Sequence, residues 1–133
     1  MTMVARMTLE ELSGRFAVNE QRRRLFDLLV DELASIQTQC RSLRVLVFGS
    51  YISDKDSPHD IDILISLIPN EECVYALWTG GLRREHPDEV DVHYYKTQRY
   101  IKDAEGLLEH FNSNPKNELQ GIAIRDAVEI TGI

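Results

Sequence analysis

The sequence has 133 residues, of which 43% are hydrophobic and 28% are charged, as is typical of a soluble globular protein with one core. A net charge of -7 at pH 7 argues against a general nucleic-acid-binding protein, because the molecule as a whole repels polyanions. The two cysteines, Cys40 and Cys73, form no CxxC pattern, so a thiolate metal site is not expected. No apolar run has the length of a signal peptide or a membrane span, and we therefore predict a cytoplasmic protein that does not contact membranes.

Two helices are predicted at the start of the chain. Thr8 and Glu11 have the spacing of a capping box for a short helix over 8–13, which Gly14 is expected to end. Asn19 is expected to cap a long helix, in which Leu25, Leu28, Leu29, Leu33 and Ile36 form one apolar stripe. Arg22, Arg23 and Arg24 near its start are interpreted as a solvated face, with a patch that faces phosphate or a partner as the alternative.

The following elements alternate between strands and helices. Strands are predicted over 43–48, 60–67 and 90–95, with a turn of helix over 51–56 and a bend at Pro58. Helices are predicted over 70–79 and 98–111, followed by a polar loop and a last strand over 120–124. The order predicts one domain over 1–133, an α/β (α+β) sandwich in which helices pack against a single sheet. Its parts are N-terminal helices over 8–39, a core over 43–95, and a C-terminal helix and strand over 98–133.

Three aspartates fall on one face of the two later strands. In the strand over 60–67, Asp60 and Asp62 point away from the alternating isoleucines, with α-carbons about 7 Å apart. In the strand over 90–95, Asp91 shares a face with Glu89 and His93. If the two strands are neighbours, the three carboxylates form a site for one or two Mg²⁺ ions, which relieve the repulsion between them. Glu89 is a rival third carboxylate, expected to be exposed, and His93 is interpreted as an ordinary strand histidine that could orient Asp91.

Gly49 and Ser50 follow the first strand directly, nine residues before Asp60. Gly49 lets a phosphate approach the backbone closely, and the Ser50 hydroxyl and nearby N–H groups are suited to bind it. A phosphate site beside metal carboxylates indicates transfer chemistry on a nucleoside triphosphate. Lys55 is a further candidate phosphate contact, with a solvated lysine as an equal alternative.

This combination of Gly-Ser, Asp-Ile-Asp and a third strand aspartate resembles the nucleotidyltransferase superfamily of DNA polymerase β type. It is most similar to the minimal stand-alone members, several of which are antitoxins paired with a toxin. The resemblance covers residues 43–95 and implies a small mixed β-sheet with helices packed against it. It also implies that Gly49 and Ser50 hold the β- and γ-phosphates, that Asp60 and Asp62 bind two Mg²⁺ ions, and that Asp91 binds the second ion and accepts a proton.

The activity implied by the resemblance is Mg²⁺-dependent transfer of a nucleoside monophosphate, AMP in the first instance, from ATP or another NTP to a hydroxyl. Since no second domain is predicted, the acceptor is expected on a partner protein such as a toxin. Transfer to RNA or to a small molecule is the alternative acceptor, and RNA is disfavoured by the acidic charge. Two further alternatives are an inactive module of the same fold that neutralises a partner by binding, and a sensor of divalent ions or nucleotides.

Overall fold

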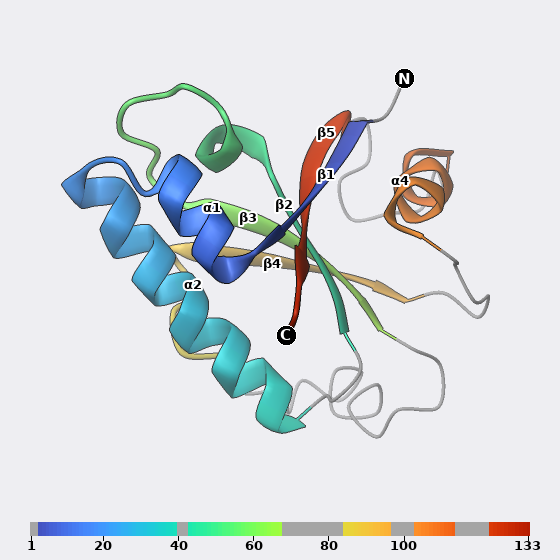
Figure 1. Ribbon diagram of the computed structural model, residues 1–133. Coiled ribbons are helices and arrows are strands. Elements are labelled where there is room, and N and C mark those ends of the chain that lie inside the picture. Colours follow the sequence, from blue (N-terminus) through green and yellow to red (C-terminus); the bar gives the residue numbers. More distant parts are fainter. Residues whose placement is uncertain (1–2, 40–42, 68–83, 97–102, 114–122) are drawn as a thin grey trace.

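The computed structural model describes residues 3–39, 43–67, 84–96, 103–113 and 123–133 (Figure 1). In these residues the chain forms five strands, three α-helices and one 3₁₀ turn. In chain order they are β1 (Met3–Thr8), α1 (Leu9–Phe16), α2 (Glu20–Gln39), β2 (Leu43–Phe48), η1 (Gly49–Ile52), β3 (Ile61–Leu67), β4 (Val90–Lys96), α4 (Ala104–Ser113) and β5 (Asp126–Thr131).

The five strands form one mixed sheet in the order β1-β5-β2-β3-β4. The pairs β1/β5 and β3/β4 are parallel, whereas β2 is antiparallel to both of its neighbours, β5 and β3. The strand predicted over 43–48 is therefore confirmed, and it is the central strand of the sheet. The strands that carry Asp62 and Asp91 are neighbours, as the sequence analysis required of a shared site.

Helices cover both faces of the sheet, with α1 and α2 on one side and α4 on the other (Figure 1). Alternation along the strands assigns side chains to two cores. The first core lies under α1 and α2 and includes Leu29, Val45, Val47, Ile61 and Ile63. The second lies under α4 and includes Leu46, Leu64, Tyr95, Leu107 and Phe111. Both faces of β2 and β3 are thus buried, which explains their nearly continuous apolar sequences.

The predicted starts of the first two helices are confirmed, and one predicted end is wrong. The Thr8 side chain accepts from the Glu11 N–H, and the Glu11 side chain accepts from the Thr8 N–H, so the capping box of α1 is complete. Asn19 Oδ1 accepts from the Arg22 N–H at the start of α2. Gly14 does not end α1, which continues to Phe16, because one glycine costs a helix only about 1 kcal/mol.

The C-terminal part of the chain differs most from the predicted elements. The described part of the helix predicted over 98–111 begins at Ala104 and continues to Ser113. The strand predicted over 120–124 is wrong for Ile124, because the last strand begins at Asp126. The edge strand β1 was not predicted at all. The helix predicted over 70–79, Cys40, Cys73 and most of the polar loop lie outside the described residues. Within the residues that are described, no helix is both long and apolar enough to cross a membrane.

Candidate metal centre

The register of β3 and β4 places Asp62 directly beside Asp91. Both side chains lie on the face of the sheet opposite α2, because their neighbours Ile61, Ile63 and Val90 belong to the core under α1 and α2. The Asp62 side chain is 22% exposed and the Asp91 side chain 50% exposed. Two carboxylates in register on parallel strands repel one another unless a cation or a hydrogen-bond donor lies between them.

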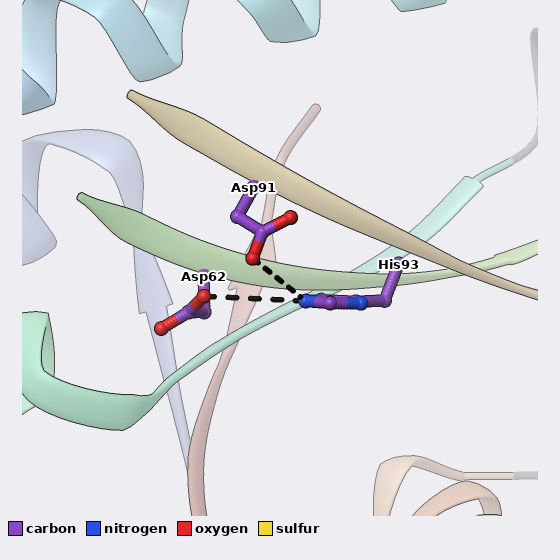
Figure 2. Close-up of side chains that lie close together, drawn as sticks. All are labelled: Asp62, Asp91 and His93. Carbon is purple, nitrogen blue, oxygen red and sulfur yellow. Dashed lines mark ion pairs between the residues drawn. The ribbon is translucent and has the colours of Figure 1, made fainter. Parts of the chain in front are cut away.

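His93 provides a nitrogen at this position (Figure 2). Its Nε2 lies 3.3 Å from Asp91 Oδ2 and 4.0 Å from Asp62 Oδ1, and its side chain is 15% exposed. One ligand atom from each of Asp62, Asp91 and His93 lies within 4.8 Å of the other two, which is close enough for a shared metal ion. His93 was interpreted as an ordinary strand histidine, with orientation of a carboxylate or a water as the alternative, and the structure places its ring next to both carboxylates.

Gly49 lies against the Asp62 carboxylate. The end of β2 pairs with β3 so that Phe48 is opposite Asp62, and the chain then turns into η1 at Gly49. Gly49 has φ +80°, and a Cβ at this position would lie 2.7 Å from Asp62 Oδ2. Both the backbone angle and the contact therefore require glycine, and the close contact at Gly49 is with the candidate metal ligand Asp62, whereas the approach of a phosphate to Gly49 stays a prediction.

Asp60 lies immediately before β3 and does not belong to the group formed by Asp62, Asp91 and His93. Burial raises the pKa of Asp60 above its ordinary value, and the carboxylates of Asp62 and Asp91 raise it further. His59 and Lys55 act in the opposite direction on this pKa. The three predicted carboxylates thus share one electrostatic environment, although only Asp62 and Asp91 are in direct register.

The remaining predicted residues lie in the segment between β2 and β3. Ser50 is half-buried in η1, and its carbonyl oxygen accepts from the backbone N–H and the hydroxyl of Ser53. Lys55 is exposed in the loop that follows. A pocket of about 420 Å³ opens beside Gly49, and Phe48, Ser53, Ile124 and Arg125 are among the residues that line it. This pocket gives a ligand room next to the Gly-Ser turn.

Two interpretations of charged residues are corrected by the structure. Glu89 does not join Asp91, because its carboxylate lies 3.4 Å from Arg24 of α2, which covers the opposite face of the sheet. Arg22 does not lie on the solvated face predicted for the three arginines, whereas Arg23 and Arg24 are exposed, as that prediction requires. Arg22 is 2% exposed and donates to backbone carbonyls of the η1 turn and the loop after it. The helical pattern shows which residues contact the sheet, but it cannot show that a loop distant in sequence covers one end of the helix.

Residues 2–125 match a family of unknown function, DUF6932, and the chain belongs to this family. No curated protein and no solved structure matches the chain. The matched range contains Gly49, Asp60, Asp62, Asp91 and His93, and ends just before β5.

Proposed function

We propose that this protein is a Mg²⁺-dependent nucleotidyltransferase that transfers AMP from ATP to a hydroxyl group of a partner protein. The observation that carries the proposal is the register of Asp62 with Asp91, with the glycine of the Gly-Ser turn packed against the Asp62 carboxylate. The resemblance to minimal nucleotidyltransferases assigns these residues to one site, on the condition that their two strands are neighbours. A mixed sheet in which the strand before Gly-Ser is antiparallel to the Asp-x-Asp strand is compatible with that fold.

The donor set fits Mg²⁺. Asp62 and Asp91 supply adjacent carboxylate oxygens, the ligands that Mg²⁺ prefers, and Asp60 is near enough for its pKa to respond to both. His93 supplies a nitrogen, which is a poorer ligand for Mg²⁺, and we assign it to orient Asp91 through a hydrogen bond. When bound, Mg²⁺ neutralises the charge of the triphosphate and of the developing transition state. The resemblance assigns two ions to this site.

In the proposed reaction the acceptor hydroxyl attacks the α-phosphorus of ATP, a new phosphodiester bond forms, and pyrophosphate leaves. Asp91 is the residue proposed to accept the hydroxyl proton, because its carboxylate is the more exposed of the pair. Gly49 and Ser50 are proposed to hold the β- and γ-phosphates, and the pocket beside Gly49 has room for part of the nucleotide. Arg125 also lines this pocket, and Lys55 in the loop after the turn is a further candidate phosphate contact.

The acceptor is proposed to be a side-chain hydroxyl of a toxin-like protein, as the resemblance implies, and the reaction is placed in the cytoplasm. A net charge of -7 disfavours RNA as the acceptor. The first test measures binding of Mn²⁺ and of Mn²⁺–ATP by calorimetry. Asp62→Asn should weaken Mn²⁺ binding at least about tenfold, because one of two adjacent carboxylate ligands is lost. Asp88→Asn removes an exposed carboxylate in the turn before β4 and should leave binding unchanged.

The second test measures transfer of label from α-labelled ATP, with Mg²⁺ and the product of the neighbouring gene as acceptor. Wild type and Asp88→Asn should label the acceptor, and Asp62→Asn should lose at least about 100-fold in rate. Equal labelling by wild type and Asp62→Asn, or no Mn²⁺–ATP binding by the wild type, would contradict the proposal.

A second candidate function is an inactive module that neutralises its partner by contact. The observation in its favour is His93, whose Nε2 lies 3.3 Å from Asp91 Oδ2 and 4.0 Å from Asp62 Oδ1, so a side chain of the folded chain itself already occupies the space beside both carboxylates. In this case Asp62→Asn would still neutralise the partner, and Mn²⁺ would bind no more tightly to the wild type than to Asp62→Asn.

A further inference from the structure

Three side chains at the start of α2 bind the loop that connects the Gly-Ser turn to Asp60. Asn19 Nδ2 donates to the Asp56 carbonyl at 2.7 Å, and Gln21 Nε2 donates to the Pro58 carbonyl at 2.9 Å. Arg22 binds the part of the loop that is nearest to η1. The start of α2 therefore contacts this loop over most of its length, although the two segments are more than thirty positions apart in the sequence.

Arg22 makes most of these contacts. Its Nη1 donates to the Tyr51 carbonyl at 2.5 Å, and its Nη2 donates to the carbonyls of Ser53 at 2.8 Å and Lys55 at 2.6 Å. Its Nε reaches the Lys55 carbonyl at 3.1 Å. Longer contacts join it to the carbonyls of Ser50 and Phe16. Tyr51 completes the arrangement, because its hydroxyl donates to the Arg22 carbonyl and its ring lies 5.2 Å from the guanidinium carbon.

The Arg22 guanidinium is buried and contacts carbonyl oxygens of the loop. Among the described residues no carboxylate pairs with Arg22, so carbonyl dipoles must compensate for its loss of hydration. Apart from the contacts with α2, the hydrogen bonds of this loop within the described residues are local, such as those from the Ser53 hydroxyl to the Ser50 carbonyl and from the Lys55 N–H to the Ser53 hydroxyl. In the described chain, the backbone of residues 53–60 makes one hydrogen bond to another backbone group, from Ser53 to Ser50. Its conformation therefore depends on α2.

We infer that Arg22 is a positioning residue for the proposed transfer reaction, because it holds the loop whose two ends carry Gly49 and Asp60. The inference rests on the proposed function. Gly49 must remain against Asp62 while Gly49 and Ser50 hold phosphate groups, and Arg22 binds the carbonyls of Ser50 and Tyr51 in that turn as well as the loop that follows it. Arg22 does not touch the reacting atoms. It acts through the backbone of residues 50–55.

Arg22→Lys tests the inference, because lysine keeps the charge but its single ammonium group cannot reach all five carbonyls that the guanidinium contacts. Asp62, Asp91 and His93 lie on strands, so Mn²⁺ alone should bind within about twofold of wild type. Mn²⁺–ATP should bind about tenfold more weakly, and amide hydrogen exchange in the loop should rise about tenfold at Ser53 and Lys55, whose N–H groups are hydrogen-bonded, because the turn loses its preorganisation. Gln21→Ala removes only the contact to Pro58 and should show smaller changes in the same direction, about two- to threefold.

The matched control is Arg44→Lys. Arg44 lies on β2, away from the loop, and its Nη1 is 2.7 Å from Glu129 Oε2. This variant should lower the unfolding temperature while leaving Mn²⁺–ATP affinity and loop exchange unchanged. Faster loop exchange in Arg22→Lys with unaltered Mn²⁺–ATP affinity would overturn the positioning role, and unaltered loop exchange would overturn the claim that Arg22 holds the loop. If the wild type binds no Mn²⁺–ATP, both the proposed function and the positioning role of Arg22 are refuted. Amide hydrogen exchange then still shows whether Arg22 holds the loop.

Discussion

Gly49→Ala perturbs the candidate site at its tightest contact. The substitution has two costs. The φ of +80° lies in the left-handed region, which costs an alanine about 1–2 kcal/mol. The new Cβ would also lie 2.7 Å from Asp62 Oδ2, so either the carboxylate or the turn must move by several tenths of an ångström. We expect the free energy of unfolding to fall by about 2–3 kcal/mol and Mn²⁺ affinity to fall about tenfold, because Asp62 is displaced from Asp91.

Gly132→Ala separates these two costs. Gly132 has φ +75°, and a Cβ there meets nothing within 4 Å, so this variant has the backbone cost without the contact. Chemical denaturation of both variants, with and without Mn²⁺, gives the difference that arises from Asp62. Gly132→Ala should lose at most about 1–2 kcal/mol and no metal affinity. Equal losses of stability in the two variants, or full Mn²⁺ affinity in Gly49→Ala, would show that Gly49 does not control the position of Asp62.

Two further predictions concern titrating side chains. The folded-state pKa of Asp60 is raised above its ordinary 3.8, so the folded chain binds the extra proton and its stability falls as pH rises from 3.8 through the raised pKa. In EDTA at pH 7, Asp60→Asn should therefore have a higher unfolding temperature than the wild type. Below pH 3.8 the two unfolding temperatures should be equal. The same difference in unfolding temperature at pH 7 and below pH 3.8 would contradict this prediction. Tyr51→Phe should lower the free energy of unfolding by about 1 kcal/mol, because the hydrogen bond to the Arg22 carbonyl is lost. Tyr94→Phe should change the free energy of unfolding by less than about 0.5 kcal/mol, because the Tyr94 hydroxyl has no partner among the described residues. Burial raises the pKa of both tyrosines to about 12, so wild-type stability should fall between pH 10 and 12, and each variant should flatten this dependence.

The faces on which Asp62 and Asp91 lie could be predicted, because they follow from the alternation of residues within each strand. Alternation along one strand places Asp62 opposite the isoleucines, and the same rule places Asp91 on its own strand. That the two strands are neighbours in register was a condition of the prediction, and the structure meets it. The contact of the His93 ring with both carboxylates was not predicted, because alternation gives the face on which a residue lies but not the direction of its ring. Glu89 was grouped with Asp91 by the same rule, which fails there because Glu89 precedes the strand.

The two strands β1 and β5 could not be predicted from local patterns. β1 is an edge strand whose residues are exposed or half-buried, so it lacks a clear apolar period. β5 begins with an exposed aspartate and contains Glu129, which pairs with Arg6 and Arg44 from its two neighbouring strands. These ion pairs join β1, β5 and β2 across positions far apart in the sequence. A pattern confined to one segment cannot show that a polar strand residue is neutralised by its neighbours.

Helix α2 holds both loops that enter the candidate site. Near its start, Arg22 binds the loop before β3, and ten positions later the fully buried Glu32 binds the segment before β4. Glu32 Oε1 accepts from Arg84 Nε at 2.5 Å, and Glu32 Oε2 accepts from the Glu85 N–H at 2.7 Å. Arg84 also donates to the Val90 carbonyl, one residue before Asp91. Ten helical residues span about 15 Å, so one rigid helix binds the segments that precede both strands of the candidate site, while the register of β3 with β4 sets the position of Asp62 beside Asp91.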